Sequence, residues 1–155
     1  MGPALPRNIF ARNCTVRRID KTAAAAFLDA NHRFGNASCR YHYGLFVDRI
    51  TGSSETAVPA GTLVAVAEFS GARTMKDGSR SCEWVRYASL KDMRVVGGMG
   101  KMLDHFVDEV HPDDVMSYAA DADGDVYRTL GFEEEGIREF PGGHQSLKFR
   151  KRFSI

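Results

Sequence analysis

The sequence predicts one mixed α/β domain built on a single central sheet, and three observations support this fold class. The chain has 155 residues, enough for one domain with one sizeable core. Strand-like and helix-like segments follow one another in the order strand, helix, three strands, helix, strand, helix and two strands. The clearest helical period covers residues 99–110, directly after a glycine-rich turn.

Each element is predicted from its own pattern. Strands are expected where residues alternate or are β-branched, over 14–19, 43–48, 61–69, 82–88, 115–119, from 132 onward, and 145–149. The strands 43–48 and 61–69 are expected to pair as a hairpin with a long connection. Helices are expected over 21–31, 99–110 and 125–130. Asp20 is the expected N-cap of the first helix, and Pro112 ends the second.

The composition is that of a soluble globular protein, with 43% hydrophobic and 26% charged residues. No apolar run approaches the roughly 18 residues that cross a bilayer, so no membrane span is expected. The three cysteines, Cys14, Cys39 and Cys82, include no CxxC pair. This excludes a disulfide framework or a zinc site and favours an intracellular, reducing compartment, the cytoplasm or an organellar matrix. Buried thiols are favoured over a catalytic cysteine.

Charge is distributed unevenly along the chain. Residues 1–19 contain four arginines and no acid, and residues 104–135 contain eleven acids against the single base Arg128. The end of the chain is basic again from Lys148 onward. We therefore divide the chain into an N-terminal arm (1–13), the domain (14–150) and a basic tail (151–155). The basic ends suit contact with nucleic acid or a protein assembly, and a solubilising tail is the alternative.

The turn at residues 96–100 lies between a strand and an amphipathic helix. Glycines let the backbone approach an anion, and a helix start presents free N–H groups and the positive end of its dipole. A phosphate or pyrophosphate is the natural ligand of such a turn. No Ser or Thr follows Lys101, which excludes a P-loop, and the spacing is not GxGxxG. A turn that only packs tightly is the alternative.

Two motifs resemble those of the GNAT acyl-CoA-dependent N-acyltransferases. The segment Val95–Leu103 is similar to the signature Q/R-x-x-G-x-G/A, with Val95 in place of Gln or Arg and Arg94 one position earlier. The segment Tyr127-Arg-Thr-Leu-Gly131-Phe132 is similar to the element Y-x-x-x-G-F. The resemblance covers about residues 14–137. It implies a GNAT-like domain, whose mixed, mostly antiparallel central sheet is flanked by helices.

The resemblance also implies a cofactor and its binding residues. Acetyl-CoA or another acyl-CoA would bind with its pantetheine-pyrophosphate at the turn. The implied cofactor-binding residues are Val95, Val96, Gly97, Gly98, Met99, Gly100 and Lys101. Tyr127 would be the general acid toward the leaving thiolate.

Transfer to an amine also needs a base, and two residues are candidates. Glu83 lies on the strand that leads to the glycine turn, and Arg86 is expected on the opposite face of that strand. His32 lies in the loop expected to shape the acceptor pocket. The alternatives are a solvated strand residue and a structural histidine. No spacing resembles a metal site, and the acids Asp121, Asp123 and Asp125 do not fit a calcium loop.

A weaker resemblance is to the phage-associated, Mom-like DNA-modification branch. Its motifs are His32-x-x-Gly35, Glu83-Trp-Val-Arg86-Tyr, Val95-Val-Gly-Gly98, Lys101-Met-Leu-x-x-Phe106 and Ser117-Tyr118-Ala119. The leading hypothesis is an acyl-CoA-dependent N-acyltransferase that acts on an amine acceptor. The alternatives are a non-catalytic GNAT-fold subunit of a larger organellar or nucleoprotein assembly, and Mom-like modification of a nucleic-acid base.

Overall fold

The computed structural model describes residues 7–50, 57–119 and 124–153. The helices are α1 (Lys21–Asn31), α2 (Gly98–Val110) and α3 (Gly124–Thr129), with a 3-10 turn η1 (Ala11–Asn13). The longer strands are β2 (Cys14–Arg18), β3 (Tyr41–Val47), β4 (Leu63–Phe69), β6 (Arg80–Ser89), β8 (Asp114–Ala119), β9 (Glu133–Phe140) and β10 (His144–Arg152). The short strands are β1 (Arg7–Phe10), β5 (Arg73–Thr74) and β7 (Met93–Val96).

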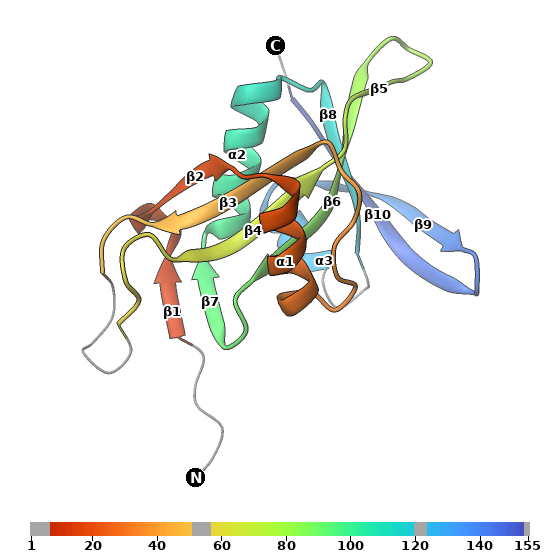
Figure 1. The fold of residues 1–155 in the computed structure, drawn as a ribbon. Helices are drawn as coiled ribbons and strands as arrows, with labels where there is room; N and C mark the ends of the chain where they lie inside the picture. The colour runs from red at the N-terminus through yellow and green to blue at the C-terminus, as the bar shows by residue number, and fades with distance from the viewer. Residues whose placement is uncertain (1–6, 51–56, 120–123, 154–155) are drawn as a thin grey trace.

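One mixed sheet organises the described part of the molecule (Figure 1). Its eight strands follow the order β2-β3-β4-β6-β8-β10-β9, with β5 paired to β6. Every pair is antiparallel except β6–β8, which is parallel. The predicted fold class is therefore confirmed, as is the predicted pairing of the strands β3 and β4 across a long connection.

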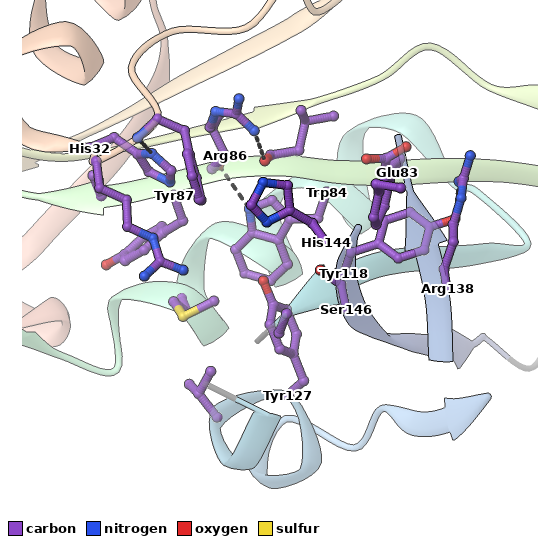
Figure 2. A pocket seen from close by; sticks show the side chains of 18 of the residues that line it. His32, Glu83, Trp84, Arg86, Tyr87, Tyr118, Tyr127, Arg138, His144 and Ser146 are labelled. Carbon is purple, nitrogen blue, oxygen red and sulfur yellow. Dashed lines mark hydrogen bonds between the residues drawn. The ribbon is translucent and has the colours of Figure 1, made fainter. Parts of the chain in front are cut away.

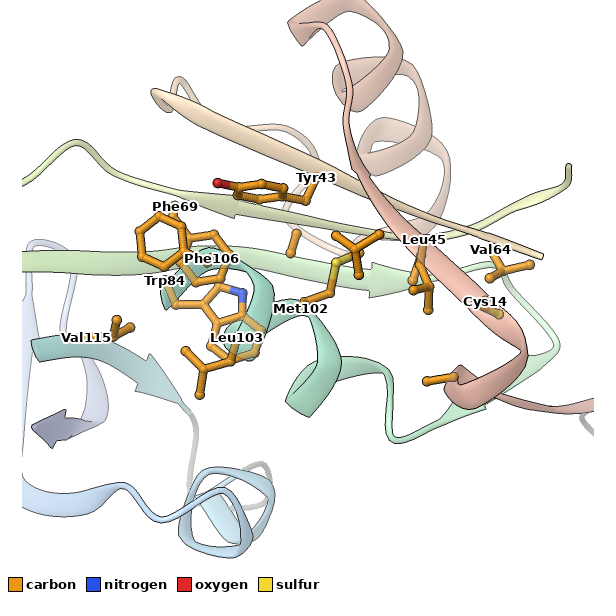
Figure 3. Packing of buried hydrophobic residues seen from close by; sticks show 14 of the residues in the cluster. Cys14, Tyr43, Leu45, Val64, Phe69, Trp84, Met102, Leu103, Phe106 and Val115 are labelled. Atoms are coloured by element: carbon orange, nitrogen blue, oxygen red, sulfur yellow. The ribbon is translucent and has the colours of Figure 1, made fainter. Parts of the chain in front are cut away.

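Helices α1 and α2 cover opposite faces of this sheet (Figure 1). Phe27 and Leu28 of α1 pack on Val66 and Ala88. The larger cluster lies under α2, where Phe106 stacks on Phe69 with ring centroids 3.9 Å apart (Figure 3). Burial of this aromatic surface fixes α2, and with it the preceding glycine turn, against the sheet.

Helix α1 has its predicted bounds, and α2 ends where predicted but begins one residue earlier, at Gly98. The Ala23 N–H donates to Asp20 Oδ1 over 2.7 Å, which caps α1. Helix α2 ends at Val110 because His111 adopts a left-handed conformation with φ of 53° and Pro112 follows. In the described residues no helix is long and apolar enough to span a bilayer.

A second, two-stranded sheet joins β1 in parallel to β7, immediately before the glycine turn. Residues 7–13, which we expected to form an arm, include the buried core residues Ile9 and Ala11. At the other end of the chain, β10 continues to Arg152. The domain boundaries stay a prediction. Asp121 and Asp123 of the acidic stretch lie outside the described residues.

A buried ionic network ties β6, β8, β9 and β10 together at one end of the sheet. Arg150 Nη1 donates to Asp114 Oδ1 over 2.5 Å and to Ser81 Oγ over 3.1 Å. Arg150 Nε lies 3.0 Å from both carboxylate oxygens of Glu135. Because Asp114 is 1% exposed and Arg150 7%, these groups need one another in place of water.

Candidate functional site

Strands β6 and β8 separate after three paired positions, and a cavity of about 1140 Å³ opens between them. Ser81, Cys82 and Glu83 pair with residues 114–116. Beyond them, within the described residues, β6 pairs only with β4 and β8 only with β10. The two strands thus form a cleft that is closed at the ionic network and open toward the start of α2.

A β-bulge in β6 accompanies this separation. Trp84 lies opposite Phe69 and Arg86 lies opposite Glu68, so Val85 is the extra residue. The bulge brings Trp84 and Tyr87 to one face, where their rings meet edge to face with centroids 6.2 Å apart. Our expectation that Glu83 and Arg86 lie on opposite faces is therefore wrong. The inserted residue resets the alternation, and both line the cavity.

The cavity is lined from six parts of the chain. The contributing residues are Asn31, His32, Arg33 and Phe34 at and after the end of α1, residues 83–89 of β6, Met99 of α2, Tyr118 and Ala119 of β8, Val126 and Tyr127 of α3, and Arg138, Phe140, His144, Gln145 and Ser146 of the β9–β10 hairpin. Figure 2 shows His32 and Tyr87 toward one end, Glu83 and Arg138 toward the other, and Tyr127 between them. The structure therefore brings the three predicted catalytic residues to one cavity, with Glu83 and His32 far apart in it.

Tyr127 is held rigidly below the middle of the cavity (Figure 2). Its ring stacks on Phe149, with centroids 5.4 Å apart. Ser117 Oγ lies 3.1 Å from Tyr127 Oη and 2.9 Å from the carbonyl oxygen of Trp84. A serine has one hydroxyl hydrogen and the carbonyl can only accept, so Ser117 donates to Trp84 and Tyr127 donates to Ser117. The phenolic oxygen is thereby fixed in the cavity wall.

Glu83 is half-buried in the cavity. Burial raises the pKa of its carboxyl, and the nearby charges of Arg138, Arg73 and Arg86 offset part of that effect. A carboxylate with a raised pKa in a cleft suits proton transfer near neutral pH.

His32 caps the end of α1 and is hydrogen-bonded within its loop. The Phe34 N–H donates to His32 Nδ1 over 3.0 Å. Burial lowers the pKa of the imidazole, and the charges of Arg86 and Arg33 lower it further. Arg86 Nε donates to the carbonyl oxygen of Gly35 over 3.0 Å, which ties this loop to β6. The ring is therefore neutral at neutral pH and helps to shape the loop.

The glycine turn has the geometry that an anion-binding helix start requires. Gly97 is the N-cap of α2 and has a φ of 80°, which favours glycine. The first helical hydrogen bond runs from the Lys101 N–H to the Gly97 carbonyl oxygen over 3.1 Å. The N–H groups of Gly98, Met99 and Gly100 therefore have no acceptor within the helix. Packing explains two glycines as well: a Cβ on Gly98 would overlap the Tyr87 hydroxyl, and one on Gly100 would lie 3.3 Å from Leu130.

The other predicted turn residues lie in different surroundings. Val95 is half-buried against the core, and Val96 and Gly97 are exposed. Of the seven, Met99 alone appears among the described residues that line the cavity. Lys101 Nζ donates to the carbonyl oxygens of Ala11, over 2.9 Å, and of Cys14, over 2.5 Å. Its ammonium group therefore holds η1 against α2.

Sequence reasoning missed the contribution of the β9–β10 hairpin. Arg138 Nη1 donates to Tyr118 Oη over 2.6 Å, and its guanidinium lies 4.8 Å from the ring centroid of Phe140. The sequence did predict the hairpin itself, through the strands expected from residue 132 onward and over 145–149 with the pair Gly142-Gly143 between them. No motif indicated which of its residues face the cavity.

Comparison with known proteins identifies the fold. No family model matches the sequence, and a search of curated proteins found no relative. A chain of the NatC complex, solved with Gag peptide and CoA, matches with a TM-score of 0.64, 12% identity, and coverage of 92% of this chain and 99% of that chain. Arabidopsis thaliana Naa50, solved with the bisubstrate analogue CoA-Ac-MVNAL, matches with a TM-score of 0.63, 10% identity, and coverage of 91% and 99%. FeeM, an N-acyl amino acid synthase from uncultured soil microbes, matches with a TM-score of 0.62, 11% identity, and coverage of 90% of both chains.

The chain has the GNAT fold. The GNAT resemblance seen in the sequence is thereby confirmed at the level of fold. The resemblance to the Mom-like branch finds no support in these comparisons and stays a prediction.

In this GNAT-fold chain the C-terminal basic residues are engaged with neighbours. Lys148 and Arg152 lie 3.6 Å from oxygens of Glu135, and Arg150 belongs to the buried network. Lys151 Nζ donates to the Leu130 carbonyl oxygen over 2.7 Å. Contact of this end with nucleic acid stays a prediction. Across the described ranges, no group of His, Cys, Asp and Glu side chains could hold a metal ion.

Proposed function

We propose that this protein is an acyl-CoA-dependent N-acyltransferase. The observation that carries the proposal is the cleft between β6 and β8, which joins the free N–H groups at the start of α2 to a cavity containing Tyr127 and Glu83. The neighbouring structures solved with CoA or a CoA conjugate support the same assignment.

The residues present fit an acyl-CoA. The N–H groups of Gly98, Met99 and Gly100 and the dipole of α2 suit a pyrophosphate. The Leu90 N–H donates to the Val64 carbonyl oxygen, so alternation along β6 turns the main-chain groups of Ser89 toward the open cleft. An extended pantetheine carries amide groups that suit this free strand edge. A backbone cradle of this kind does not require the Gln or Arg that Val95 replaces.

The side chains supply the proton transfers. An acyl-CoA provides an acyl group activated as a thioester, and its transfer forms a C–N bond, breaks the C–S bond and releases a thiol and one proton. Glu83 accepts a proton from the ammonium group, directly or through a water molecule, and so frees the nitrogen lone pair. Tyr127 donates its phenolic proton to the departing sulfur, and the Ser117 hydroxyl then turns from the Trp84 carbonyl oxygen to donate to the phenolate oxygen that remains.

Two measurements on the purified chain test this function. Acetyl-CoA is expected to raise the thermal midpoint, since a ligand at 100 times its Kd stabilises a folded protein by about 2.7 kcal/mol. Thiol release from acetyl-CoA in the presence of amines is expected to follow. No thermal shift at millimolar acetyl-CoA would overturn the proposal. A shift without thiol release for any amine would instead favour the non-catalytic alternative.

A further inference from the structure

More positively than negatively charged side chains line the cavity. Arg33, Arg86 and Arg138 provide three guanidinium groups, and Glu83 is the only carboxylate among the described lining residues. The lowered pKa of His32 keeps that ring neutral. A cavity with this charge attracts anionic groups and repels compounds that carry several positive charges.

One guanidinium lies beside the proposed base. Glu83, Tyr118, Arg138 and Phe140 form what we call the hairpin end of the cavity. Figure 2 shows Glu83 and Arg138 at this end. Among the charges that act on the Glu83 carboxyl, Arg138 has the largest effect. The bond to Tyr118 Oη uses one of the five N–H donors of Arg138. The rings of Tyr118 and Phe140 lie 5.1 and 4.8 Å from its carbon Cζ, which fixes the guanidinium in place.

We propose that the acceptor is a free amino acid, with its ammonium group at Glu83 and its carboxylate at Arg138. This inference rests on the proposed function and adds the chemical class of the acceptor. The new bond joins the amino nitrogen to the acyl carbon as the C–S bond breaks, and the products are an N-acyl amino acid, a free thiol and one proton. The carboxylate of the acceptor takes no part in bond making, so Arg138 acts by positioning and binding.

Other amine classes fit the hairpin end less well. A polyamine needs several carboxylates, and the described cavity wall offers Glu83 alone. The N-terminal residue of a peptide has a neutral amide where a free amino acid has its carboxylate. An amide makes no ionic hydrogen bond to a guanidinium, whereas a carboxylate binds it through two parallel bonds.

The acceptor class is tested with a panel assayed by thiol release at saturating acetyl-CoA. The panel contains the twenty L-amino acids, the carboxamide of each amino acid that is accepted, and spermidine. We expect kcat/KM to be at least about tenfold higher for an accepted amino acid than for its carboxamide, because a charge-assisted pair contributes more than about 1.4 kcal/mol. Equal values for acid and carboxamide, a preference for spermidine, or no accepted amino acid would overturn the inference.

The variant Arg138→Gln tests whether Arg138 causes the preference for an amino acid over its carboxamide. In this variant the ratio of kcat/KM for amino acid over carboxamide is expected to fall to about 1, while Arg49→Gln, an exposed site outside the cavity, keeps the wild-type ratio. The ratio cancels any change that the variant causes in the Glu83 pKa, because that change affects both acceptors. A ratio that survives in Arg138→Gln would contradict the assignment of Arg138.

Binding without turnover gives an independent readout. Trp84 is the only tryptophan of the chain and lines the cavity, so its fluorescence reports ligands there. In the presence of CoA, N-acetyl-L-phenylalanine is expected to bind more tightly than its carboxamide, and equal affinities would count against the inference. A protein that binds no acetyl-CoA at all would contradict the proposed function itself, whereas CoA binding without discrimination contradicts only the acceptor class.

Discussion

At the scale of single residues, the proposed acyl transfer depends most on the hydroxyl of Tyr127. Replacing Tyr127 by Phe removes that hydroxyl and keeps the stacking on Phe149. We expect kcat to fall about 10²-fold, the lower end of what a general acid contributes, with little change in the thermal midpoint. Steady-state thiol release and a melting curve check this, with Tyr41→Phe, outside the cavity, as the matched control. An unchanged kcat would exclude Tyr127 as the acid.

The activity is expected to depend on pH through Glu83, in a direction that follows from the burial of its carboxyl. Since its pKa is raised, the rising limb of kcat/KM against pH is expected above the usual range of a glutamate. The variant Glu83→Gln is expected to lose that limb and about 10²-fold in rate or more. A pH profile from 4 to 9 checks both, and an unchanged limb in the variant would assign it to another group.

The same raised pKa affects stability. A carboxyl that is harder to ionise in the folded state stabilises the fold while protonated, and this contribution is lost as pH rises through its folded pKa. The thermal midpoint of Glu83→Gln relative to wild type is therefore expected to be higher at pH 8 than at pH 4. A difference in thermal midpoint between the variant and wild type that does not change with pH would contradict a raised pKa of Glu83.

The sequence predicted Tyr127 and Glu83 because each lies in or beside a recognisable pattern. It placed Arg86 on the wrong face, because one bulged residue reverses the alternation and leaves no mark in composition. Arg138 was missed for another reason. Its position in the cavity depends on how a hairpin from the end of the chain lies beside β6, which no local pattern records.

At the scale of elements, Lys101 connects the N-terminal segment to the glycine turn. Its two hydrogen bonds hold the carbonyls of η1 and β2, and Ala11 of η1 approaches Gly97. The variant Lys101→Met is expected to lower the free energy of unfolding by about 2 kcal/mol and to weaken acetyl-CoA binding. Denaturant titration and calorimetry check this, with the exposed Lys91→Met as control. Weaker binding at unchanged stability would instead indicate direct contact with the ligand.

Breaking the buried ionic network at the closed end of the cleft is expected to lower the free energy of unfolding more than Lys101→Met does. Removing the carboxylate with Asp114→Ala leaves Arg150 and Ser81 without a shared partner. We expect a loss of about 3 kcal/mol in the free energy of unfolding, as for other broken buried pairs. The control Glu133→Ala removes an exposed acid of β9 and should stay within about 0.5 kcal/mol of wild type. Equal losses in both variants would show that the network does not anchor β6 to β8.

Three short strands, β1, β5 and β7, were not predicted from the sequence, and two of them pair in parallel with each other. Strands β1 and β7 have four residues each, and their pairing joins segments about eighty-five positions apart in the chain. The long helices, by contrast, were predictable from periodicity, from the N-cap Asp20 at the start of α1 and from Pro112 after the end of α2. Local patterns thus predicted the long helices. The strand pairing that supports the glycine turn joins segments distant in sequence and was not predicted.

For the whole molecule, the order of strands and helices was enough to predict the fold class, and the motifs at residues 95–103 and 127–132 carried the resemblance to GNAT proteins. The cavity could not be predicted, because it arises where one parallel pairing stops after three positions. The bulge in β6 lies directly beyond these positions, and β8 goes on pairing with β10. In this chain the fold class therefore follows from local periodicity, whereas the cavity follows from the register of the strands.

The central claim is that the start of α2 and the open edge of β6 bind an acyl-CoA. Titration of ¹⁵N-labelled protein with CoA, followed by amide NMR spectra, tests it most directly. We expect saturable shifts that are largest for the amides of Gly98, Met99, Gly100 and Ser89. Saturable binding that leaves these four resonances in place, or no shifts at millimolar CoA, would contradict it.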